Sequence, residues 1–492
     1  YYRTANEKLL PAIIMSDDDK VFHEVRVPMS DYQFEAYAKI RKVELDKEKK
    51  QKTLRGLHKQ VNNSEVLNIS SSYRVFSRTA CNFVFPTPPG RPIPVHQEGK
   101  EEVDETAADD SANVETAEFA EESGVDNKAE YQRKIESAME YLRTNQELLS
   151  PKGLSQYSPK MLSMIKNIKN PNHKGLHLVY SNFRTLEGIG IFQEALNAQG
   201  YQEFKIAKRN DKWVLDFEPD SRPCYALYTG TEDMEVKEIL RNIFNGDWNP
   251  PNVPDAIGMK LREISSNNLY GEIIQVFMIT AAGAEGINLK NTRYVHMMEP
   301  YWHNVRLEQV MGRARRIRSH DDLPEDERTV QAFLYLSVMN NEQLKTGNFK
   351  EIEVNDLSKL RDNVAVTTDE FLYEIAQMKQ RINNQFLRVM KETAMDCHVH
   401  IKDHKKQENL VCYGPVSGNK TFASYPDIEK DLQEDNDEHL RKGPRSTIPP
   451  SMQIVSKKKK QKPQEVEVLE EEEEKEEEKE EEKEEEKEEE KE

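Results

Sequence analysis

The sequence feature that most constrains the fold is an alternation of short apolar runs and amphipathic segments between residues 157 and 338. The apolar runs have the length of strands, and the segments between them have the length and periodicity of helices. The strand candidates are Leu176–Tyr180, Cys224–Tyr228, Ile273–Ile279, Tyr294–Met298 and Val330–Leu336, and the helix candidates are Leu186–Gln199, Met234–Phe244 and Val305–Arg316. Apolar strands that alternate with helices predict an α/β fold, in which helices cover both faces of a parallel sheet.

Small and polar residues follow four of the predicted strands. In parallel α/β sheets, ligands are handled by the loops at the carboxyl ends of the strands. The segments that fall there are Ser181-Asn182, Thr229-Gly230-Thr231, Thr280–Gly286 and Glu299–His303. We therefore expect the functional site on this one edge of the sheet.

An arginine cluster lies near the end of the α/β region, with Arg313, Arg315, Arg316 and Arg318 within six positions. On a helix that continues through Arg316, Arg313 and Arg316 share a face, so their guanidinium groups can converge on one phosphate. The alternative is a solvated basic helix face.

The upstream segment Thr280–Leu289 follows an apolar strand and is rich in small residues. Small residues let a backbone approach a ligand closely and offer amide groups to phosphate or ribose. A plain strand-to-helix turn is the alternative.

The net charge of −19 is concentrated in two segments. Residues 98–130 carry −11 and residues 470–492 carry −13, which leaves +5 on the rest of the chain. The remaining charge permits a nucleic-acid partner without requiring one. We expect both acidic segments to be disordered, because they contain too little apolar surface to offset the entropy of ordering.

Taken in order, these segments resemble the second RecA-like lobe of superfamily two helicases, in particular the Swi/Snf-type double-stranded DNA translocases. The matching segments are Leu178–Phe183 with motif IV, Tyr228–Thr231 and Phe244-Asn245 with the aspartate-glycine-serine-threonine segment and its helix, Thr280–Leu289 with motif V, Glu299–Trp302 with the tryptophan-asparagine-proline turn, and Gln309–Arg316 with motif VI. Residues 73–78, residues 81–86 and the predicted helix after Thr367 resemble helicases of large nucleocytoplasmic DNA viruses, including the small subunit of the poxvirus early transcription factor.

The resemblance implies a role for each matching residue. Arg313 and Arg316 would be the catalytic arginines that reach the γ-phosphate of ATP. The residues at the ATP and lobe interface would be Gln309, Gly283, Glu285 and Gly286. The residues that contact the nucleic-acid backbone would be Ser181, Asn182, Thr229, Thr231 and Thr280.

The resemblance also implies the cofactors and partners. ATP and Mg²⁺ would be bound mainly by a first lobe, since no G-x-x-x-x-G-K-[ST] phosphate loop occurs in the chain, and this fragment alone is expected to be inactive. The partners would be nucleic acid, with double-stranded DNA favoured, the chain's own N-terminal RecA-like lobe, and RNA polymerase or transcription factor subunits. The alternative is a non-catalytic scaffold that binds nucleic acid or a polymerase in a transcription complex.

The expected organisation has five parts. They are a bridge segment at 1–95 that follows a missing first lobe, an acidic linker at 96–130, a RecA-like helicase lobe at 131–345, a helical extension at 346–415 and a charged tail at 416–492. No apolar run is long enough to span a membrane. The four cysteines form no paired C-x-x-C framework, which indicates a reducing, intracellular compartment. We expect this compartment to be a viral factory or virion if the protein is viral, and otherwise the nucleus.

Two further signals are weaker. Cysteines and histidines between Cys397 and Cys412 have no recognisable zinc spacing, so we expect no metal site and interpret them as surface residues beside a loop. The lysines at 457–460 fit either a nuclear address or a solvated run in the tail. The segment Gly246–Tyr270 is an insertion without an assigned role.

Overall fold

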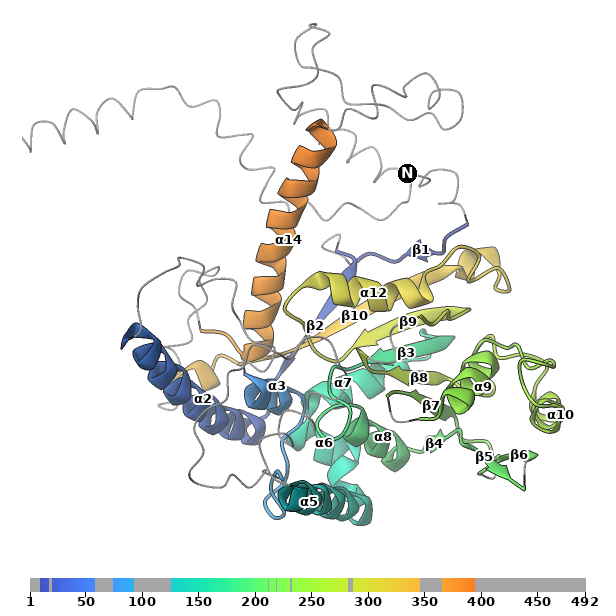
Figure 1. Ribbon diagram of the computed structural model, residues 1–492, viewed down its shortest axis with the longest axis horizontal. Helices are drawn as coiled ribbons and strands as arrows, with labels where there is room; N and C mark the ends of the chain where they lie inside the picture. The colour runs from blue at the N-terminus through green and yellow to red at the C-terminus, as the bar shows by residue number, and fades with distance from the viewer. Residues whose placement is uncertain are drawn as a thin grey trace, which may run out of the picture. The chain divides into compact units, whose positions relative to one another are not determined.

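The computed structural model describes residues 9–16, 20–57, 74–92, 125–210, 212–217, 219–230, 232–281, 286–345 and 365–393 (Figure 1). The two acidic segments, the residues after 393 and therefore the Cys397–Cys412 cluster lie outside these ranges, apart from the helical stretch that begins at Val125.

A parallel sheet in the order β1-β10-β9-β3-β8-β7-β4 forms the centre of the fold, and β2 also pairs with β10. Its pairings within the described residues are all parallel. The strands are β1 (Ala12–Ile13), β2 (Phe22–Pro28), β3 (Leu176–Tyr180), β4 (Gln202–Glu203), β7 (Cys224–Tyr228), β8 (Val276–Ile279), β9 (Thr292–Met297) and β10 (Thr329–Val338). A separate antiparallel hairpin joins β5 (Ile206–Arg209) and β6 (Lys212–Leu215). The predicted α/β class with a parallel sheet is confirmed.

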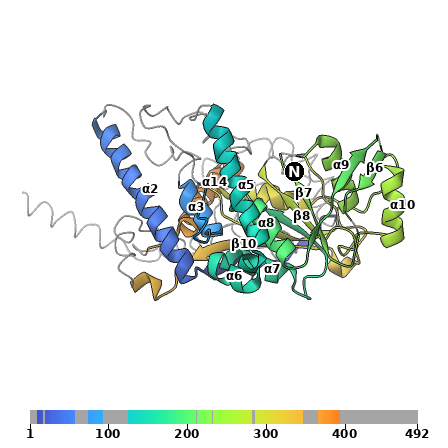
Figure 2. The ribbon, with the colours of Figure 1, turned by 90° about the horizontal axis from the view of Figure 1, so that it is seen from below.

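Helices pack on both faces of the sheet (Figures 1 and 2). One face holds α9 (Met234–Phe244), α10 (Asp255–Ile264) and α12 (Asn304–Ala314). The other face holds α5 (Val125–Thr144), α6 (Pro151–Tyr157), α7 (Pro159–Ile168) and α8 (Ile189–Ala198). The short 3₁₀ turns are Gln146–Leu149, Glu325–Glu327 and Gln343–Lys345.

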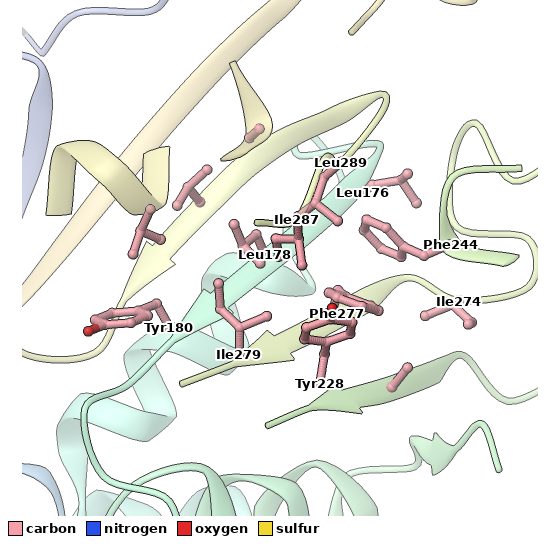
Figure 3. Packing of buried hydrophobic residues seen from close by; sticks show 14 of the residues in the cluster. Leu176, Leu178, Tyr180, Tyr228, Phe244, Ile274, Phe277, Ile279, Ile287 and Leu289 are labelled. Carbon is pink, nitrogen blue, oxygen red and sulfur yellow. The ribbon is translucent and has the colours of Figure 1, made fainter. Parts of the chain in front are cut away.

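Alternating side chains of each central strand enter the two cores. In β3, Leu178 belongs to the core under α9 and α12, and its neighbour Val179 belongs to the core under α7 and α8. Figure 3 shows the first core, in which Ile287 and Leu289 from the segment after β8 pack with Leu178. A strand that is buried on both sides requires the continuous apolar runs that the sequence shows.

The first two helices that the structure describes and the last one pack at one side of the sheet. They are α2 (Asp31–Leu57), α3 (Val75–Asn82) and α14 (Thr368–Thr393). A small apolar cluster that includes Phe34, Tyr37 and Cys81 joins α2 to α3. The predicted helix after Thr367 is therefore present, and its first turns are buried against β10 and α3.

The structure adds elements that the sequence did not predict. Strands β1 and β2 extend the sheet beyond β10, although residues 1–95 were expected to form only a bridge segment. β2 was missed because its sequence, FHEVRVP, has charged residues among its apolar ones and lacks the continuous apolar run of the strands that are buried on both faces. Helix α5 begins at Val125, inside the expected acidic linker, and α10 lies within the insertion at 246–270.

Candidate nucleotide and nucleic-acid interface

The four strands β9, β3, β8 and β7 are neighbours and parallel, so their carboxyl ends meet at one edge. Ser181 directly follows β3, Thr280 follows β8 and Thr229 follows β7, and Glu299 lies two positions beyond the end of β9. The structure therefore brings together the segments that the sequence placed on a common edge.

Glu299 is the centre of the polar contacts at the end of β3. Its carboxylate accepts hydrogen bonds from the Ser181 hydroxyl at 3.1 Å and from the Asn182 side-chain amide at 2.9 Å. The backbone N–H of Asn182 donates to the same carboxylate. Ser181 is fully buried, so its hydroxyl faces Glu299 in the interior, and its predicted contact with nucleic acid stays a prediction.

Burial raises the pKa of Glu299, and the Asn182 N–H together with the nearby charges of Lys160 and Arg78 opposes that rise. The carboxylate is 1% exposed, and a charge in such a position requires hydrogen-bond donors and cations around it. Glu299 therefore stabilises the turn at Ser181-Asn182 by accepting its hydrogen bonds.

Thr229 has a carboxylate partner of its own at the end of β7. Its hydroxyl lies 2.7 Å from a carboxylate oxygen of Glu232 and accepts a hydrogen bond from Nε of Arg184 at 2.7 Å. Arg184 also pairs with Glu232, with an N···O distance of 3.3 Å. Thr231, the other predicted contact in this segment, lies outside the described residues.

Thr280 differs from the other two residues. Its hydroxyl is buried and has no hydrogen-bond partner in the part of the chain that the structure describes. An unsatisfied buried hydroxyl is unfavourable, so natural proteins keep such groups mainly where a ligand or a conformational change uses them. Among the described hydroxyls at this edge, Thr280 therefore differs from Ser181 and Thr229, which both lie against carboxylates.

The segments that resemble motifs V and VI contact each other directly. The N–H of Leu289 donates to the carbonyl of Arg313 at 3.2 Å, and Nη2 of Arg316 donates to the carbonyl of Ile287 at 3.1 Å. Because Ile287 and Leu289 are also core residues, the positions of both arginines depend on the core beneath α12.

The helical argument for the paired arginines was wrong. Helix α12 ends at Ala314, and Arg315 already has non-helical backbone angles, so Arg316 does not share a helix face with Arg313. The chain turns at this point because Ser319 Oγ accepts the Arg316 N–H at 3.2 Å and donates to the Ala314 carbonyl at 3.1 Å. The two arginines are brought near the same segment by the turn rather than by helical periodicity.

The other predicted interface residues are only partly described. Gln309 is exposed on α12, and Gly286 has a φ of +75°, a left-handed conformation that favours glycine. Gly283 and Glu285 lie outside the described residues.

Sequence reasoning missed the residues that hold this edge in place. Asn82, Lys160 and Asp369 are buried and polar, and they link Glu299 to helices far away in the sequence. The only available signal was the match of residues 81–86 and of the helix after Thr367 to viral helicases, and that match indicated no contact.

The described residues contain neither a candidate metal-ligand cluster nor a helix suited to span a membrane. No cluster of three or more histidine, cysteine or acidic side chains suited to a metal ion occurs among them. None of the helices in that part of the chain combines the length and the apolar character needed to cross a membrane.

The fold and the edge define an α/β lobe with its polar residues at the carboxyl ends of the parallel strands, and part of this lobe is similar to helicases. Residues 257–318, which include the segment after β8 and helix α12, match the helicase conserved C-terminal domain. The predicted resemblance to a helicase C-terminal domain is confirmed over these residues.

The similar proteins include viral ones. A protein of Acanthamoeba polyphaga mimivirus that carries the name of an ATP-dependent RNA helicase is 26% identical over 461 residues, which cover 84% of this chain and 48% of that protein. A protein of African swine fever virus named termination factor NPH-I homolog is 31% identical over 261 residues, which cover 49% of this chain and 33% of that protein. The chain thus spans half or less of the length of these relatives.

A solved structure, the C-terminal part of the Fun30 ATPase domain, aligns with a TM-score of 0.35 and 13% identity, covering 75% of this chain and 97% of that one.

Proposed function

We propose that this chain is the C-terminal lobe of an ATP-dependent helicase or translocase of viral type. In this role, Arg313 and Arg316 act on ATP, and the carboxyl edge of the sheet contacts the nucleic-acid backbone. The contact between the segment after β8 and the end of α12 carries the proposal, because Arg313 and Arg316 both bond the segment that follows Thr280.

The chemistry of Arg316 fits a phosphate ligand. Its side chain is half-buried, Nη2 is used by the Ile287 carbonyl, and the other guanidinium N–H groups donate to no residue in the described part of the chain. A guanidinium held at one nitrogen keeps a defined orientation and presents its remaining donors to phosphate oxygens. Arginines in this position raise turnover by about 10³ to 10⁵ in other nucleotide hydrolases.

ATP would bring the reacting phosphate, and Mg²⁺ would be held with it mainly by another lobe. Within the described residues, the guanidinium group of Arg316 is a donor suited to phosphate oxygens. This lobe would orient the nucleotide phosphates and link them to the segment at Thr280.

The proposed nucleic-acid contact is a backbone contact, which positions a track without reading its sequence. Thr280 can donate its unsatisfied hydroxyl to a phosphate oxygen, whereas the hydroxyls of Ser181 and Thr229 already lie against carboxylates. The names of the viral relatives include RNA helicase and termination factor, so they do not favour DNA over RNA. The expected preference for double-stranded DNA therefore stays a prediction, as does a role in transcription or with polymerase subunits.

The test is binding of the chain to a fluorescein-labelled DNA duplex and to an RNA strand, measured by anisotropy. We expect affinity that falls as salt rises and a weaker complex for Thr280→Val, by about 5- to 20-fold, because one charge-assisted hydrogen bond is lost. Thr292→Val is the matched control, since Thr292 is a buried threonine at the opposite, amino end of β9. Equal affinities for wild type and Thr280→Val would refute the contact.

A further inference from the structure

A continuous chain of buried polar contacts joins α14 to the turn at Ser181-Asn182. Nζ of Lys160 lies 2.5 Å from a carboxylate oxygen of Asp369 and donates to Oδ1 of Asn82 at 2.9 Å. Nδ2 of Asn82 donates to Glu299 at 3.1 Å, and Glu299 holds Ser181 and Asn182. We call the four residues Asp369, Lys160, Asn82 and Glu299 the buried relay.

The four members come from four separate parts of the fold. Asp369 lies in the first turn of α14, Lys160 is in α7, Asn82 ends α3, and Glu299 follows β9. None of them is more than 1% exposed. The same oxygen of Asp369 also accepts the Ser337 N–H from β10 at 2.9 Å.

Burial makes the relay a set of mutually dependent contacts. Each charge is separated from water and is stable only while its partner stays in place. In such an environment hydrogen bonds polarise one another, and a change at one member alters the positions of the others. A shift of Asp369 therefore changes how Lys160 and Asn82 hold the Glu299 carboxylate.

We propose that the buried relay couples the position of the first turn of α14 to the conformation of the Ser181-Asn182 turn. Glu299 is the positioning residue in this coupling. This inference rests on the proposed function, which assigns the carboxyl edge of the sheet, of which the turn is a part, to nucleic-acid binding. Helix α14 thereby controls nucleic-acid affinity through a contact at its own N-terminus. The alternative is that the Lys160–Asp369 ion pair only stabilises the packing of α14. In that case, substitutions at Asp369 leave the Ser181-Asn182 turn unaffected.

The chain contains a matched control for this relay. Glu232 holds Thr229 at the same edge, as Glu299 holds Ser181, but Glu232 bonds Thr229 and Arg184 rather than a member of the relay. Both carboxylates can be changed to the isosteric amide. A relay predicts energetic coupling of Asp369 with Glu299 and additivity of Asp369 with Glu232.

The experiment is a pair of double-mutant cycles in the full 492-residue chain, with the dissociation constant for a labelled DNA duplex as the readout. The first cycle combines Asp369→Asn with Glu299→Gln, and the second combines Asp369→Asn with Glu232→Gln. We expect the first cycle to deviate from additivity by about fivefold and the second to be additive within about twofold. Additivity in both cycles would overturn the proposal.

A second measurement does not depend on nucleic acid. The Asn182 N–H donates to Glu299, so its hydrogen exchange reports the state of the turn. We expect Asp369→Asn and Asn82→Ala to speed exchange at residues 181–183 by at least about tenfold, with far-UV circular dichroism unchanged, whereas Glu232→Gln leaves this exchange at the wild-type rate. Unchanged exchange in Asp369→Asn would refute the relay. Faster exchange in a chain that binds no nucleic acid would refute the proposed function and leave the relay standing.

Discussion

Two buried histidines predict how the stability of the fold depends on pH. His177 on β3 and His296 on β9 are fully buried, with Nδ1 of His177 3.0 Å from Nε2 of His296. His177 also bonds the His173 carbonyl through Nε2 at 3.2 Å, and His296 bonds the Tyr335 hydroxyl through Nδ1 at 2.9 Å. All four ring nitrogens are satisfied when each ring carries a single proton on Nε2, so a second proton on His177 would place its Nδ1–H against the Nε2–H of His296.

Burial lowers the pKa of His177 to about 3 and also lowers the pKa of His296 well below its ordinary value. The folded state therefore binds fewer protons than the unfolded state, so folding free energy is lost as pH falls below about 6.5. Near pH 5, about 1.5 pH units below the unfolded pKa, His177 alone costs about 2 kcal/mol of stability. Above about pH 7 the two histidines contribute no pH dependence.

The assay is urea denaturation of wild type and His177→Gln near pH 7.5 and near pH 5. We expect the stability difference between the two pH values to shrink by about 2 kcal/mol in His177→Gln. Tyr335→Phe is the control, because it removes the phenol that bonds His296 but keeps both titrating rings, and so lowers stability at both pH values. If the difference in unfolding free energy between the two pH values is as large in His177→Gln as in wild type, His177 is not its cause.

Two other changes test the packing around the site. Lys160→Met should destabilise the chain by about 3 to 5 kcal/mol, because it leaves the Asp369 carboxylate buried without its cation, and denaturation at neutral pH measures this. Gly312→Ala should stabilise the chain by about 0.5 to 1 kcal/mol, because an added Cβ in the interior of α12 meets nothing within 4 Å, and thermal melting checks it. A neutral Lys160→Met, or a Gly312→Ala that melts earlier than wild type, would contradict these contacts.

The buried strands and their carboxyl edge could be predicted from the sequence. β3 and β7 have the bounds that their apolar runs indicated, and α9 begins at Met234, where Asp233 accepts the Glu235 N–H at 2.9 Å as a helix cap. These elements depend on local signals, namely continuous apolar residues and a capping side chain, so a single sequence is sufficient to locate them.

Features that depend on distant contacts could not be predicted. The end of α12 is set by Ser319, which bonds both Ala314 and Arg316, and a basic run of arginines gives no sign of this turn. β2 is a strand because β10 pairs with it, with Phe22 opposite Ala332. The relay residues Asn82 and Glu299 are 217 positions apart, so no sequence pattern links them.

The most direct test of the central claim is nucleic-acid-stimulated ATP hydrolysis by the protein together with its ATP-binding lobe. We expect Arg316→Ala to lower stimulated turnover by at least about 10³-fold while ATP binding and the fold persist. Arg318→Ala serves as control, since its exposed side chain lies two positions away and 3.9 Å from Asp321, and it should retain wild-type turnover. Turnover in Arg316→Ala that equals the wild-type rate would contradict the claim that this lobe completes an ATPase site.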